Sequence, residues 1–324
     1  MNKKKMAYLS IACFLVGGLL IIPCSTSIYL VLLCRFIVGF GSGILILIST
    51  AILPDFFEGK ELSNVIGLVL AGSGFWGFVF SNVSGFVGGK FGWKIAYLLH
   101  LYAVIPLILF AVFIPDQPLV ESKQKKANAP TQKGDLSPMI FVYTLAGMAA
   151  FMLIQVMWSN TSLWVTGTLG GTVAQAGMAS GMMSLFSCIG RLFGKIYGKL
   201  GRFTIHLDLA LLIVGMAIAS HSHSYAMALV ALAFVGVSMA LTAPAALNRC
   251  IEISPRCQER AQSITSIGFA LGNFGSTYWK LFVGKFGDGT LNSVFRVNSY
   301  FTVAVLVIAF GISAVLISRE KKAQ

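Results

Sequence analysis

The chain has 324 residues, of which 56% are hydrophobic and 11% are charged. Soluble globular proteins carry about a quarter charged residues, so this composition excludes an ordinary water-soluble domain and indicates a polytopic membrane protein. The formal net charge is +13. In a soluble protein that charge would suggest a nucleic-acid partner, whereas in a membrane protein an excess of Lys and Arg marks the cytoplasmic loops.

Ten stretches of the chain are apolar enough to cross a membrane as helices, each of which needs about 20 predominantly apolar residues. The alternating pattern of a transmembrane β-barrel is absent from the sequence. In chain order the predicted spans are 6–22, 28–52, 64–88, 95–114, 138–158, 174–193, 205–220, 224–247, 261–283 and 297–317. We therefore predict an all-α integral membrane protein, a polytopic helical bundle of about ten transmembrane helices.

Lys and Arg are distributed unevenly between the two sides of these spans. When the N-terminus is placed inside, most of the 24 Lys and Arg fall on the inner side, and a smaller set that includes Lys280 falls on the outer side. Because Lys and Arg concentrate in cytoplasmic loops, both termini are predicted to be cytoplasmic in a multi-pass protein of the cell (inner) membrane. The same bias explains the positive charge without nucleic acid.

A polar segment divides the apolar chain unequally. Residues 115–137 are rich in Pro and in charges of both signs, which is typical of a flexible linker. We predict an N-terminal helix bundle of four spans over 1–114, a cytoplasmic linker over 115–137 and a C-terminal six-helix bundle over 138–324.

The two predicted bundles share a short repeat. Residues 85–92 read GFVGGKFG and residues 280–287 read KLFVGKFG, each at the end of a Gly-rich span. A half-length repeat is typical of transporters built from two related bundles. The repeat places the counterpart of the loop at 194–202 near the first residue. We therefore expect the first bundle to lack its first two helices, through truncation, a late start codon or gene decay.

The N-terminal run could also be a signal peptide, because three Lys precede an apolar stretch that ends near Ser25. Pro23 directly before Cys24 argues against cleavage at this position. The repeat assigns the run to a permanent span, and we expect it to be retained.

Three motifs resemble the major facilitator superfamily of secondary transporters. The loop Gly194-x-x-x-Gly198-Lys199-x-Gly201-Arg202 is similar to the family's loop between the second and third helices of each half, with Gly198 where the first-half version usually carries Asp. The stretch 35–41, which reads RFIVGFG, is similar to the family's helix-four motif, with Val38 in place of Gln. The stretch 92–116 is similar to the end of the family's first half.

The resemblance implies two pseudo-repeated halves of the major facilitator type, which rock about a central cavity in alternating access. Drug–proton antiporters of the family usually carry Gly-Pro-x-x-Gly-Gly in helix five. The aligned residues 81–86 read SNVSGF and lack the Pro, which weakens the case for drug–proton antiport.

Polar and aromatic residues inside the spans are the candidates for the solute cavity. An Arg near a helix centre costs roughly 2.5–3.5 kcal/mol on insertion scales, so Arg35 is expected to face this cavity, where it would bind an anionic group. The alternative is that its side chain snorkels to the interface. The full set of cavity candidates is Arg35, Phe75, Trp76, Asn82, His100, Gln155, Asn273 and Tyr278.

Two further predictions concern the inner side of the second bundle. The basic loop that follows span 174–193 is expected to act as a gate, although its charges could simply set the topology. Its candidate residues are Arg191, Gly194, Gly198, Lys199, Gly201 and Arg202. Asp208 is the only acid inside a predicted span. It is a candidate for proton coupling, while a salt bridge with Arg202 is the alternative that we favour.

Several classes of chemistry find no support in the sequence. The Gly-rich runs at 67–77 and 268–275 are predicted to be helix-packing surfaces, since neither follows a strand or precedes Gly-Lys-Ser/Thr as in a nucleotide-binding loop. The six Cys form no CxxC motif, and no nucleophile stands with a base. We therefore expect no enzyme, no cofactor and no metal site.

The leading hypothesis is a secondary active transporter that exports small amphipathic compounds, because its spans are rich in aromatic and Met residues and poor in charge. The expected partners are a small-molecule solute, protons or another coupling ion, and the lipid bilayer, with the protein as a monomer. Uptake of an organic anion through Arg35 is the first alternative. A non-transporting membrane sensor or a truncated remnant is the alternative from another class.

Overall fold

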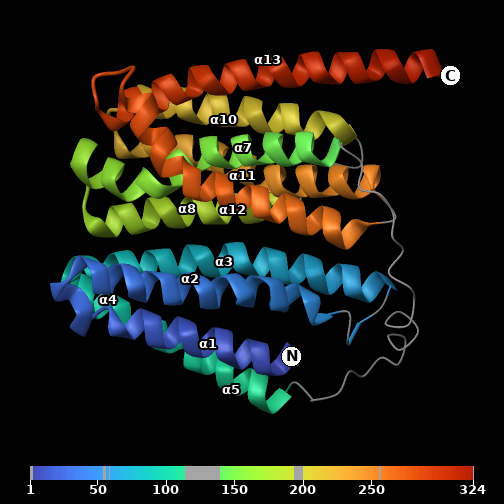
Figure 1. The fold of residues 1–324 in the computed structure, drawn as a ribbon. Coiled ribbons are helices and arrows are strands. Elements are labelled where there is room, and N and C mark those ends of the chain that lie inside the picture. Colours follow the sequence, from blue (N-terminus) through green and yellow to red (C-terminus); the bar gives the residue numbers. More distant parts are fainter. Residues whose placement is uncertain are drawn as a thin grey trace. The chain divides into compact units, whose positions relative to one another are not determined.

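The computed structural model describes residues 3–53, 56–57, 59–113, 139–192, 200–254 and 257–323. Every regular element within these ranges is helical, as Figure 1 shows. This confirms the predicted all-α fold. The chain divides into two compact units, one formed by Met1–Val69 with Ser84–Pro130 and the other by Leu70–Val83 with Thr131–Gln324.

The first unit is built from two long helices and one interrupted helix. In chain order its elements are α1 (Lys3–Leu20), the short 3₁₀ helix η1 (Pro23–Thr26), α2 (Ile28–Ala51), the two ends of α3 (Gly59–Phe91), α4 (Trp93–Tyr97), the 3₁₀ helix η3 (Leu98–Ala103) and α5 (Val104–Phe113). The interruption at η3 ends three residues before Pro106, which is the third residue of α5. Pro has no N–H and its ring clashes with the carbonyl four residues earlier, which favours an interruption of the α-helix at this point.

The second unit contains the middle of α3 and six further long helices. These are α7 (Met139–Leu163), which continues into the π-helical turn η4 (Trp164–Thr168), α8 (Val173–Leu192), α10 (Thr204–Ser220), which follows the 3₁₀ turn η5 (Gly201–Phe203), α11 (Tyr225–Ile253), α12 (Gln258–Gly284) and α13 (Leu291–Ala323). Helix α8 begins with a capping box, because Thr172 and Gln175 exchange hydrogen bonds between their side chains and backbone N–H groups.

The helices of the second unit pack side by side in pairs (Figure 1). Helix α7 runs along α12, and a Cβ at Gly272 would lie only 2.4 Å from the carbonyl oxygen of Met148. This close approach confirms that the Gly-rich run of α12 is a packing surface. Helix α10 packs against both α11 and α13. The core between the helices contains large apolar side chains such as Met157, Leu212 and Phe295.

Two amide side chains of α13 link this core through hydrogen bonds. Asn298 is fully buried; its Oδ1 accepts from Trp279 Nε1 at 2.8 Å, and its Nδ2 donates to the carbonyl oxygen of Leu153 at 3.0 Å. Asn292 Oδ1 accepts from the indole of Trp164 at 2.7 Å. The amides therefore satisfy indole and backbone groups that a lipid-embedded core could not otherwise solvate.

Each of the ten predicted spans falls on a helix or on a continuous helical stretch. Among the described residues, five stretches meet the length and hydropathy of a membrane span by themselves: Ile28–Ile46, Trp93–Phe113, Met139–Thr168, Tyr225–Cys250 and Leu291–Ser313. The span predicted at 297–317 lies within α13, which is longer. The predicted span is shorter than the helix because the bilayer limits the length of the apolar stretch and not the length of the helix.

Candidate functional site

Arg35 contacts a residue that the sequence analysis did not select. It lies on α2, is exposed, and donates a hydrogen bond from its guanidinium to the phenol oxygen of Tyr97 on α4. The guanidinium carbon also lies 5.2 Å from the centre of the Tyr97 ring, which is a cation–π contact. Both contacts of the positive charge are therefore with the neutral side chain of Tyr97.

His100 completes this group, which we call the Arg35 cluster (Arg35, Tyr97 and His100). The imidazole stacks on the Tyr97 ring with 5.5 Å between the centres and 3° between the planes. Its Nδ1 lies 2.9 Å from the carbonyl oxygen of Tyr97, and because a carbonyl only accepts, Nδ1 carries the proton in this contact. A Cβ at Gly18 would come within 2.2 Å of His100 Cδ2, so α1 makes room for the ring.

The structure thus brings together two predicted cavity residues, Arg35 and His100, through a third that was missed. The signal for Tyr97 was its spacing, since residues three apart lie on the same face of a helix and Tyr97 is three residues before His100. This cluster can hold an anionic or hydrogen-bonding group, because it combines a guanidinium, a phenol and an imidazole in one unit.

A second polar contact lies between α7 and α12. Lys280 was grouped with the outer-side charges, but it lies inside α12 and donates from Nζ to Asn160 Oδ1 at 2.5 Å. Asn160 is buried, and its Nδ2 donates to the carbonyl oxygen of Val156. The hydrogen bond that the structure shows for Lys280 is thus with a neutral amide. Asp288, an acid in the loop after α12, accepts hydrogen bonds from Thr290 instead, and these lower the pKa of Asp288 to about 2.

Asp208 is buried between α10 and α11 and contacts two hydroxyl groups. Ser238 Oγ donates to Oδ1 at 2.5 Å and Thr242 Oγ1 donates to Oδ2 at 2.8 Å. The predicted alternative partner, Arg202, has a side chain outside the described part of the structure. What the structure gives is a carboxylate that joins two helices through hydroxyl donors.

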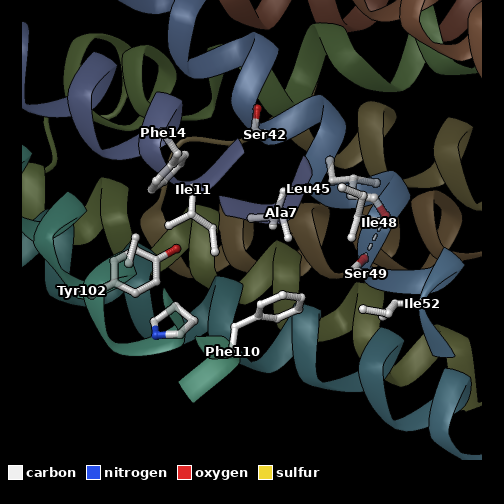
Figure 2. A pocket seen from close by; sticks show the side chains of 13 residues that line it. Ala7, Ile11, Phe14, Ser42, Leu45, Ile48, Ser49, Ile52, Tyr102 and Phe110 are labelled. Carbon is white, nitrogen blue, oxygen red and sulfur yellow. Dashed lines mark hydrogen bonds between the residues drawn. The ribbon is translucent and has the colours of Figure 1, made fainter. Parts of the chain in front are cut away.

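The first unit also contains an apolar cavity of about 340 Å³ between α1, α2, η3 and α5 (Figure 2). Its walls are formed by side chains such as Ile11, Phe14, Ile48 and Phe110. The hydroxyl of Ser49 is engaged with its own helix, where it donates to the carbonyl oxygen of Ile46 at 2.8 Å (Figure 2). None of the predicted site residues lines this cavity, and apolar sequence alone gave no signal for it.

The sequence model of one protein family, the Major Facilitator Superfamily, matches residues 1–279 of the chain. The chain belongs to this superfamily. The resemblance inferred from the motifs is thereby confirmed: this is a multi-pass membrane protein from a family of transporters and not of enzymes.

Individual relatives of this superfamily member are distant. The MFS-type transporter YtbD of Bacillus subtilis (strain 168), which is uncharacterized, is 26% identical over 183 residues, or 53% of this chain. The aligned part spans only 44% of the length of YtbD.

Solved structures of transporters share the fold at low sequence identity. A bacterial homolog of the human lysosomal transporter Spinster, inward-facing and unoccupied, has a TM-score of 0.68 at 15% identity, over 95% of this chain and 81% of that chain. A mutant of the peptide transporter POT has a TM-score of 0.74 at 12% identity, over 97% and 80%. The fucose:proton symporter FucP of E. coli has a TM-score of 0.55 at 15% identity, over 95% and 83%.

The other cavity candidates of this facilitator do not form one cluster. Phe75 and Trp76 are exposed, and their rings meet edge to face at 5.7 Å. Tyr278 is also exposed and lies 5.7 Å from Phe274. The remaining cavity candidates are three residues with side-chain amides.

Of these amides, Asn82 is half-buried and donates to the carbonyl oxygen of Phe78 in its own helix at 2.7 Å. Gln155 is half-buried on α7 and Asn273 is exposed on α12. Their role in a solute cavity stays a prediction.

The predicted gating loop lies mostly outside the described residues. Gly194, Gly198 and Lys199 belong to the part that the structure does not describe, and the same holds for the side chains of Arg191 and Arg202. Gly201 is described and has a φ of +48°, a left-handed conformation that favours glycine. The gating role of this loop stays a prediction.

Proposed function

We propose that this protein is a secondary transporter that exports small amphipathic organic compounds by alternating access. The observation that carries the proposal is the exposure of paired aromatic rings, Phe75 with Trp76 on α3 and Phe274 with Tyr278 on α12. Aromatic faces bind apolar and cationic groups of a solute over a large area. Few charged groups accompany them in the spans, which favours a solute with a large apolar body.

A second candidate function is transport of an organic anion, and the Arg35 cluster favours it. The guanidinium of Arg35 is bound by the neutral phenol of Tyr97, so its charge is available to a carboxylate, sulfonate or phosphate. An uncompensated charge in a span is costly and marks a substrate path. Lys280 is likewise bound by a neutral group, the amide of Asn160.

We further propose a membrane topology, which the charge distribution supports, and a monomeric state. Both termini lie in the cytoplasm and the protein works as a monomer in the cell membrane. The first bundle extends over 1–114 and is joined by the linker 115–137 to the second bundle over 138–324. Protons are the proposed coupling ion, with Asp208 as the acidic candidate in the described spans.

Transport into everted membrane vesicles tests direction and substrate class together. A panel of labelled amphipathic cations, neutral compounds and organic anions is offered to vesicles with and without the protein. Export by the cell is measured as accumulation inside everted vesicles. Trp76→Ala should reduce accumulation of amphipathic compounds, whereas Phe86→Ala, which removes another exposed aromatic ring from α3, should leave it unchanged.

Each outcome of this panel selects one reading. Accumulation of cations and neutral compounds supports export of amphipathic compounds. If organic anions alone move, and if Arg35→Lys selectively abolishes their transport, the second candidate replaces the first. Absence of transport for the whole panel, with the protein correctly inserted, favours a non-transporting membrane protein.

A further inference from the structure

A small cavity of about 70 Å³ lies at the end of the second unit where α7 and α10 begin and α11 ends. Its polar lining consists of Tyr143 on α7, His206 on α10, Arg249 on α11 and Ser313 on α13. Four helices thus direct polar residues to one small space. None of the residues that line this cavity belongs to the Arg35 cluster or to the aromatic pairs, and transport as proposed above does not use it.

The wall of the cavity contains a buried polar atom without a partner. His206 is 6% exposed, and its Nε2 lies 3.3 Å from Ser313 Oγ, but no hydrogen-bond partner is found for its Nδ1. The ring is held by Phe310, whose centre is 4.2 Å away, and by Phe203. A buried polar atom left unsatisfied is unfavourable, so a ligand or water belongs next to this imidazole.

The chemistry of the lining favours an anion. Arg249 brings a guanidinium to the cavity, and none of the described residues that line it is acidic. A guanidinium with an imidazole, a phenol and a hydroxyl offers the charge-assisted and neutral donors that phosphate oxygens accept. The volume holds a group about the size of two water molecules at roughly 30 Å³ each, which is the order of size of a phosphate group.

The rim of the cavity is apolar, which identifies the source of the phosphate. Val142 and Ile312 line the cavity and are 41% and 42% exposed, and the neighbouring Phe310 is 50% exposed. Apolar side chains that are exposed beside a site for an anionic headgroup are placed to contact the acyl chains of the same lipid. We propose that this cavity binds the phosphate of an anionic phospholipid, whose acyl chains lie along α7 and α13. Basic pockets between helices at the cytoplasmic leaflet are suited to such headgroups.

Lipid retention by the full-length protein tests this site. Delipidated protein in detergent is titrated with phosphatidylglycerol, and bound lipid is counted by native mass spectrometry, with diacylglycerol and inorganic phosphate as competitors. Arg249→Gln should weaken retention of one phosphatidylglycerol by about tenfold, as expected for loss of a charge-assisted hydrogen bond. Arg260→Gln is the matched control, because Arg260 is exposed at the same end of the unit and does not line the cavity.

A second variant separates lost binding from lost folding. Ala309→Leu fills the cavity and leaves every charge in place, so it should also reduce retention, while diacylglycerol should not compete. Equal effects of Arg249→Gln and Arg260→Gln would overturn the proposal, because they would indicate attraction by surface charge alone. Inorganic phosphate that binds as tightly as phosphatidylglycerol would reassign the site to a free ion. Absence of retained lipid would leave only water in the cavity and would also overturn the proposal.

Discussion

At the scale of single residues, the contact between Arg35 and Tyr97 decides how the guanidinium is oriented. Tyr97→Phe removes the oxygen that accepts from Arg35 and keeps the ring that stacks on His100. We expect the apparent KM for an anionic solute to rise by roughly 10-fold or more, the effect of one lost hydrogen bond to a charged group, with kcat little changed. Tyr8→Phe on α1 is the control, and an equal rise in both variants would contradict the positioning role.

Gly18 tests the same cluster by shape instead of chemistry. A Cβ at this position would lie 2.2 Å from His100 Cδ2, whereas a Cβ at Gly39 would meet nothing within 4 Å. Gly18→Ala should therefore displace His100 and cost about 1–3 kcal/mol as overpacking does, seen as a lower melting temperature in detergent. Gly39→Ala should melt like the wild type. Identical melting of the two variants would show that His100 does not occupy this place.

The candidate site could be predicted only in part from the sequence. Arg35 was found because a charge in an apolar span is conspicuous, and His100 because it is polar there. Tyr97 was missed although it is an aromatic residue inside the predicted span 95–114. Its role depends on α2 and α4 meeting in space, which one sequence without contacts does not reveal.

At the scale of helices, Asn298 joins α13 to α7 and α12. Asn298→Ala leaves the indole N–H of Trp279 and the carbonyl of Leu153 without their partner. The expected cost is about 1–3 kcal/mol, as for buried groups left unsatisfied, measured as a loss of melting temperature. Asn273→Ala, at an exposed position of α12, should melt like the wild type. A stable Asn298→Ala variant would mean that the amide is not the link between these helices.

Asp208 links α10 and α11 in the same way, and its exchange for Asn separates a structural role from proton coupling. The amide keeps one oxygen acceptor and loses the other, so either Ser238 loses its partner or Thr242 keeps only the carbonyl oxygen of Ser238 as acceptor. Side-chain hydrogen bonds between membrane helices are worth roughly 0.6–1.7 kcal/mol, and stability should fall by that order. If Asp208 carries the coupled proton, Asp208→Asn abolishes transport driven by a proton gradient and spares solute exchange. If Asp208 only joins the helices, solute exchange and gradient-driven transport fall together.

At the scale of the whole molecule, the helices were predictable because the bilayer demands long apolar stretches with internally satisfied backbones. All ten predicted spans fall on helices, even where the 3₁₀ helix η3 interrupts one of them between α4 and α5. The hydrogen bonds of Lys280 and Asn298 were not predictable in this way. Asn160, the partner of Lys280, and Leu153, one partner of Asn298, lie on α7, more than a hundred residues away, and only packing brings α12 and α13 to that helix.

Counterflow in proteoliposomes is the measurement that tests the central claim, transport by alternating access, most directly. Purified protein is reconstituted with an excess of unlabelled amphipathic compound inside, and a trace of the labelled compound is added outside without ATP. The account predicts that label accumulates transiently above its external concentration in liposomes with the protein and not in empty ones. Label that never exceeds equilibrium, although the protein is folded and inserted, would contradict alternating-access transport.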